Sequence, residues 1–99
     1  MARTPIHPGE ILKEELKDLG MSANALALAL HVPANRISQI LNGRRNVTAD
    51  TALRLAQFFG TTPEFWLNLQ KSYELRLAER KSGKAIRRRV KPLKGFRAA

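Results

Sequence analysis

The sequence contains no cysteine, so its 99 residues can form neither a disulfide bond nor a thiolate metal site. It also lacks an apolar stretch long enough to span a lipid bilayer, and residues 1–10 lack the apolar run of a signal peptide. We therefore expect a cytoplasmic protein that does not contact membranes.

Acidic residues are scarce, and this shortage makes the chain strongly basic. Eight Asp and Glu residues stand against 18 Lys and Arg residues, for a formal net charge of +10 at pH 7. Such a surplus favours a polyanionic partner, because Lys and Arg release condensed counterions when they neutralise phosphates. Seven basic residues and no acidic one lie in residues 84–99, so residues 1–83 are only mildly basic.

No segment alternates apolar and polar residues as a strand does, whereas helical spacing recurs along the chain. Capping residues, Gly and Pro mark where the helices begin and end. The pattern predicts five helices, at residues 8–19, 23–30, 34–41, 49–59 and 63–81. The expected fold class is all-α, with one domain over residues 1–83.

Residues 84–99 are expected to form a flexible basic tail, because Pro92 and Gly95 interrupt any long helix there. Three roles for this tail stay open. The three alternatives are a solvated extension, a segment that becomes ordered on a partner, and a source of additional phosphate contacts.

Residues 22–43 have the pattern of a helix-turn-helix, in which two short helices are joined by a tight turn. Ala27 supplies the small side chain that the approach of the two helix axes requires. The apolar anchors on both sides of the turn are Leu26, Leu30, Val32, Ile37 and Ile40. This spacing leaves one face of the second helix polar, so its first turns can enter the major groove of DNA.

Three side chains on that polar face suit base reading, because Arg pairs with guanine, and Asn or Gln with adenine, in bidentate geometry. Arg36 is the first candidate, followed by Asn35 and Gln39. The candidates for phosphate contacts are Ser22, Asn24, Ser38, Asn42, Arg44 and Arg45. The alternative is that these are ordinary polar positions on a solvated helix, and the apolar spacing of the motif argues against it.

The two histidines do not indicate a metal site, because neither His7 nor His31 belongs to a cluster with ligand spacing. His31 instead falls at the turn position that tends toward the left-handed conformation, which histidine tolerates better than most residues. No acidic pair, such as Glu14 with Glu15, has a nearby nucleophile or glycine loop. We therefore expect no metal, no cofactor and no enzymatic activity.

Six segments within the motif and on both sides of it form a further pattern: His7-Pro8-Gly9-Glu10, Leu26-Ala27, Val32-Pro33-Ala34-Asn35-Arg36-Ile37-Ser38, Asn42-Gly43-Arg44-Arg45, Thr48-Ala49-Asp50-Thr51-Ala52-Leu53-Arg54-Leu55 and Phe59-Gly60-Thr61-Thr62-Pro63-Glu64-Phe65-Trp66-Leu67-Asn68-Leu69-Gln70. These segments resemble the HigA-type (VapI-like) antitoxins, a family within the Xre group of helix-turn-helix proteins. The Pro-Gly-Glu opening and the Trp-Leu-Asn-Leu-Gln segment are not general features of the Xre group, so they favour the antitoxins.

The resemblance implies a lambda-repressor-like fold with a long fifth helix, and a homodimer that represses its own promoter by binding a palindromic operator. It also implies a protein partner, namely a co-encoded small basic toxin similar to RelE-type ribosome-dependent mRNA endonucleases. It adds support for Asn35, Arg36 and Gln39, which match the exposed part of the recognition helix. A free-standing regulator without a toxin and an interaction module that reads no DNA stay open as alternatives.

Residues 63–81 carry more apolar side chains than packing on four short helices requires. Phe65, Trp66 and Leu69 are expected to pack on the helix of residues 49–59. Tyr73 and Leu77 are expected to reach a partner subunit, and Leu69 is also counted in this dimer interface. Such a dimer would place two recognition helices about 34 Å apart, one turn of DNA. The alternative is that the whole set belongs to the core of one chain.

Overall fold

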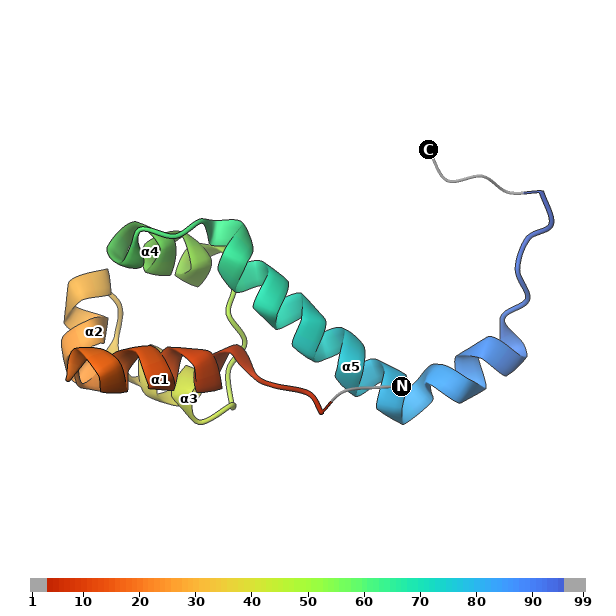
Figure 1. Ribbon diagram of the computed structural model, residues 1–99, viewed down its shortest axis with the longest axis horizontal. Coiled ribbons are helices and arrows are strands. Elements are labelled where there is room, and N and C mark those ends of the chain that lie inside the picture. The colour runs from red at the N-terminus through yellow and green to blue at the C-terminus, as the bar shows by residue number, and fades with distance from the viewer. Residues whose placement is uncertain (1–3, 96–99) are drawn as a thin grey trace.

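The computed structural model describes residues 4–95, and within that range every regular element is a helix (Figure 1). The helices are α1 (Pro8–Leu19), α2 (Ala23–Leu30), α3 (Ala34–Leu41), α4 (Ala49–Phe59) and α5 (Pro63–Arg89). The all-α prediction is confirmed, and α1 to α4 have the predicted bounds. The part of the predicted tail at residues 96–99 lies outside the described residues.

Side-chain caps fix where the helices begin. The hydroxyl oxygens of Ser22, Thr48 and Thr62 each accept a hydrogen bond from a backbone N–H in the first turn of α2, α4 and α5. At the start of α1, His7 Nδ1 accepts from the Gly9 N–H at 2.8 Å. Burial lowers the pKa of His7, which keeps this acceptor nitrogen unprotonated.

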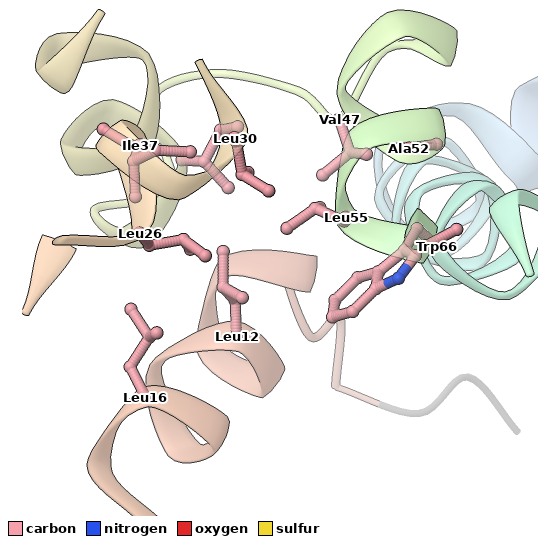
Figure 2. Packing of buried hydrophobic residues seen from close by; sticks show 12 residues of the cluster. Leu12, Leu16, Leu26, Leu30, Ile37, Val47, Ala52, Leu55 and Trp66 are labelled. Atoms are coloured by element: carbon pink, nitrogen blue, oxygen red, sulfur yellow. The ribbon is translucent and has the colours of Figure 1, made fainter. Parts of the chain in front are cut away.

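The hydrophobic core lies where α1 to α4 meet the first turns of α5 (Figure 2). Its most deeply buried side chains include Leu12, Leu26, Ile37, Ile40, Leu55 and Trp66. The Trp66 Nε1–H donates to Thr61 Oγ1 at 2.9 Å, so the indole is buried with its polar group satisfied. Trp66 packs against Phe59 of α4, as expected, and Phe65 contacts Trp66 at the edge of the core with 44% of its surface exposed.

α1 and α3 approach each other so closely at Gly9 that no side chain fits between them. A Cβ atom on Gly9 would overlap the backbone carbonyl oxygen of Ile40. Gly9 is itself buried, as is Pro8 beside it. This contact sets the distance between α1 and the end of α3, and with it the place where the α3–α4 loop begins.

α5 is longer than the sequence pattern predicted, because Gly83 does not end it. The prediction placed its end at about residue 81 and a flexible tail from residue 84, whereas the helix continues to Arg89. A glycine inside a helix costs about 1 kcal/mol relative to alanine, which weakens a helix without stopping it. The Glu79 side chain lies across Gly83 and pairs with Arg87 Nη1 at 2.7 Å.

The helix stops just before Pro92, because a proline disfavours the helical conformation in the residue that precedes it. The second half of α5 projects away from the body formed by α1 to α4 (Figure 1). Over residues 4–95, no helix has both the length and the apolar character that crossing a bilayer requires.

Candidate nucleic-acid interface

The turn between α2 and α3 has the geometry of a helix-turn-helix. His31 adopts the left-handed conformation with φ of 59°, as expected for this position. Its neighbour Val32 donates its N–H to the Ala27 carbonyl at 3.0 Å, which closes the end of α2. Ala27 is buried at 2% exposure where the two helices meet. The turn therefore presents α3 at a fixed angle to α2.

α3 has one buried face and one face toward solvent. Ile37 and Ile40 are completely buried, whereas Asn35 and Ser38 are exposed. Arg36 and Gln39 are half-buried, because each is held by a neighbouring side chain. α3 therefore has a polar face, and two of the three side chains predicted to read bases are ordered within the chain.

Arg36 is bound by an acidic residue of α4. Its Nη1 donates to Asp50 Oδ2 at 2.6 Å, and the Arg54 Nε donates to the same oxygen at 2.9 Å. Hydrogen bonds from Arg54 and from Arg36 hold the pKa of the Asp50 carboxyl below its ordinary value. Asp50 therefore remains charged at neutral pH and keeps one edge of the Arg36 guanidinium occupied.

Arg54 also connects this ion pair to the turn. Its Nη1 donates to the Leu30 carbonyl at 2.8 Å and to the His31 carbonyl at 3.4 Å. These carbonyls lie at the C-terminal end of α2, where intrahelical donors are lacking. One guanidinium thus joins α2, the turn and α4, and through Asp50 it also fixes α3.

Gln39 is bound by a side chain of the α3–α4 loop. Arg45 Nε donates to Gln39 Oε1 at 2.8 Å, which brings a predicted base reader and a predicted phosphate contact together. An open depression lies beside them, lined by Arg36, Arg45, Asn46, Thr48, Asp50 and Thr51.

The α3–α4 loop is anchored to α5 by a buried glutamine. Gln70, only 5% exposed, accepts a hydrogen bond from the Val47 N–H at 2.8 Å and donates to Glu74 Oε2 at 2.7 Å. The role of Gln70 was not predictable from the sequence, because a polar position on a helix gives no sign of a partner 23 residues earlier. This hydrogen bond fixes the loop that carries Arg44 and Arg45.

The other predicted phosphate contacts lie around α2 and α3 at the surface. Ser22 caps α2 and is exposed, as are Asn24 in its first turn, Asn42 after α3 and Arg44 in the loop. All of them are accessible to solvent. Their individual roles stay predictions.

The chain is similar to known proteins with the same geometry. A family model described as "Helix-turn-helix" matches residues 12–66, more than half of the chain. A structure of an addiction module antidote protein of the HigA family from Coxiella burnetii has a TM-score of 0.91 and 63% sequence identity, covering 92% of this chain and all of that one.

The chain belongs to the helix-turn-helix family and, within it, to the HigA antitoxins.

Two further proteins are similar to most of the chain. Virulence-associated protein I of Dichelobacter nodosus is 57% identical over 75 residues, which are 75% of this chain and 69% of that protein. The structure of Pseudomonas aeruginosa antitoxin HigA with the higBA promoter has a TM-score of 0.88 and 44% identity, covering 91% of this chain and 99% of that one. A helix-turn-helix antitoxin is a DNA-binding protein and not an enzyme, in agreement with the prediction.

Only part of the dimer interface predicted for this chain is exposed on the monomer. Tyr73 is half-buried and packs edge-on against His7 with ring centroids 4.9 Å apart. Leu69 is packed against the core, whereas Leu77 is 43% exposed. Leu77 is therefore the member of the set that is most accessible to a partner subunit, and the dimer interface itself stays a prediction.

The described part of the chain offers no set of side chains arranged to bind a metal ion. Between residues 4 and 95, no group of three or more His, Asp or Glu side chains could hold a metal ion. The predicted contact residues on α3 and the α3–α4 loop carry amides, hydroxyls and guanidinium groups, which are suited to bases and phosphates.

Proposed function

We propose that the chain is the antitoxin of a toxin–antitoxin pair and that it represses its own promoter as a homodimer on a palindromic operator. The observation that carries the proposal is the presentation of α3 by a rigid turn, in a chain that closely matches a HigA protein solved with its promoter. We expect the protein in the cytoplasm, because the promoter that it binds lies there.

Within this function, α3 reads the major groove and the residues around it hold the phosphates. Asn35 is exposed for base contact, and Gln39 and Arg36 offer the N–H groups that their partners Arg45 and Asp50 do not occupy. Arg44, Arg45 and the α2 cap at Ser22 set the register on the backbone.

The toxin partner is a small basic protein similar to RelE-type mRNA endonucleases, which the antitoxin neutralises by binding. The similarity to proteins named as HigA antitoxins and antidotes supports this half of the proposal. The test is to express the chain with the product of a toxin-sized reading frame beside its gene, and to measure both co-purification and binding to the upstream DNA. Upstream binding without any toxin partner would leave a free-standing regulator.

Arg36 and Arg44 are expected to differ in what they contribute to DNA binding. Arg36→Ala should reduce the preference for the operator by about 1–3 kcal/mol, because a base contact is lost. Arg44→Ala should weaken operator and unrelated DNA equally and lower the salt slope by about 1, because a phosphate contact is lost. Fluorescence anisotropy over a salt series measures both, and the reverse result would exchange the two roles.

Asp50 is expected to contribute to specificity through Arg36, although it touches no DNA in this scheme. Asp50→Asn should release Arg36 while it removes one negative charge beside the interface. Binding to a scrambled duplex should therefore strengthen, and the ratio of operator to scrambled affinity should fall.

The matched control for this prediction is Glu79→Gln, which removes an acidic partner of an arginine on α5, far along the chain from α3. It should leave the affinity ratio unchanged. If Asp50→Asn strengthens binding to both duplexes by the same factor, Asp50 acts by charge alone and does not position Arg36.

A further inference from the structure

A second concave surface lies between α1 and the corner at which α4 turns into α5. It is lined by Ile11, Glu15, Phe59, Thr61, Phe65 and Trp66. Its volume is about 140 Å³, and a cavity of about 150 Å³ is known to hold a benzene ring. The groove is therefore large enough for one apolar side chain of a partner.

The wall of this groove is aromatic and already ordered. Trp66 packs against Phe65 with ring centroids 5.1 Å apart and against Phe59 at 5.8 Å. The hydrogen bond from Trp66 Nε1–H to Thr61 Oγ1 holds the indole in place. A rigid aromatic surface that is partly open to solvent is typical of an anchor in a protein interface, because little ordering is needed on binding.

The helix that forms the other wall is acidic, in contrast to the rest of the chain. Its charged residues are Glu10, Glu14, Glu15 and Asp18 against Lys13 and Lys17. Half of the eight acidic residues of a chain with net charge +10 thus lie on one helix of 12 residues. None of the six lining residues is basic. This surface is complementary to a basic partner and repels DNA.

We propose that this groove between α1 and the α4–α5 corner is the docking site of the toxin, a small basic RNA-binding protein that inserts an apolar side chain there. The inference rests on the antitoxin function proposed above. A protein that holds RNA carries Lys and Arg to neutralise phosphates. The carboxylates of α1 are negatively charged, as phosphates are, so they can pair with the same cations. The aromatic wall supplies the apolar anchor.

The groove is separate from the DNA-binding face. None of its lining residues is among the predicted base or phosphate contacts, which lie on α2, α3 and the α3–α4 loop. A toxin in the groove therefore leaves the reading side chains uncovered, and operator affinity serves as an independent measure of correct folding in each variant.

The experiment is a calorimetric titration of the full chain with the protein encoded by the neighbouring toxin-sized reading frame, at low and high salt. Phe65→Ser is expected to weaken toxin binding about 30-fold, as for a hot-spot aromatic. Glu15→Lys is expected to weaken it about tenfold, with the larger loss at low salt. Both variants should bind the operator as the unchanged chain does.

Two controls carry the same chemical changes outside the groove. Leu53→Ser removes an exposed apolar side chain of α4, and Glu14→Lys reverses a charge on α1 that does not line the groove. Leu53→Ser should leave toxin affinity unchanged. Glu14→Lys should cause a smaller loss than Glu15→Lys, because only long-range attraction is affected.

The outcomes separate the two proposals. If the unchanged chain does not bind the neighbouring protein, the antitoxin function fails and the docking site fails with it. If the chain binds but Phe65→Ser and Glu15→Lys bind equally well, the function stands and the docking site is wrong. A change of oligomeric state in Phe65→Ser, with toxin affinity retained, would assign the groove to a second copy of the chain and overturn the proposal.

Discussion

Gly9→Ala is expected to destabilise the fold by at least about 2 kcal/mol, a large value for the addition of one methyl group. The new Cβ would overlap the carbonyl oxygen of Ile40, a backbone atom that no rotamer change can move. α1 must therefore shift relative to α3, which disturbs the packing of Leu12 and Leu16 in the core. Operator affinity should fall as well, because the end of α3 moves.

Urea unfolding followed by circular dichroism measures this loss. Gly20→Ala is the matched control, since a Cβ there meets no atom within 4 Å but must adopt φ of 65°. The loss of folding stability in this variant should be about 1 kcal/mol, the penalty of a left-handed conformation. Equal losses in the two variants would show that steric overlap at Gly9 is relieved at little cost.

Leu77→Asp is expected to abolish the homodimer and to weaken binding to the full operator by about 10²–10⁴-fold. A monomer binds each half-site independently and loses the gain from joining two recognition helices. Leu77 is a sharper test than Tyr73, because Tyr73 also packs against His7 at the start of α1. A charge introduced at Tyr73 would disturb the monomer itself.

Sedimentation velocity and titration with a half-site duplex measure this effect. Affinity for the half-site should be unchanged, which separates loss of the dimer from loss of folding. Leu75→Asp is the control, because Leu75 is 63% exposed and lies two residues away, on a different side of α5. A dimer that survives Leu77→Asp would show that the subunits meet elsewhere.

Local signals were sufficient to predict most of the helices. Ser22, Thr48 and Thr62 begin helices by hydrogen bonds within one turn, and Gly20 and Gly60 end two of them in the left-handed conformation. These interactions join residues three or four positions apart, so a single sequence carries them. The predicted end of α5 before Gly83 was wrong, because a glycine inside a helix is tolerated when other contacts support the helix.

The candidate site was harder to predict, because its side chains are fixed by distant partners. The spacing of Asp50 and Arg54 is a helical i, i+4 pair that the sequence does show. The hydrogen bond from Arg54 to the Leu30 carbonyl spans 24 residues and depends on how α2 and α4 pack. No periodicity reveals that Arg36 and Gln39 are bound within the chain.

The partners of Arg36 and Gln39 have a consequence for the entropy of DNA binding. Ordering a long side chain at an interface costs roughly 0.5–1.5 kcal/mol on association. Hydrogen bonds restrict both side chains in the free protein, from Arg36 Nη1 to Asp50 Oδ2 at 2.6 Å and from Arg45 Nε to Gln39 Oε1 at 2.8 Å. Much of that ordering therefore takes place when the chain folds, so less rotamer freedom is lost when the duplex arrives.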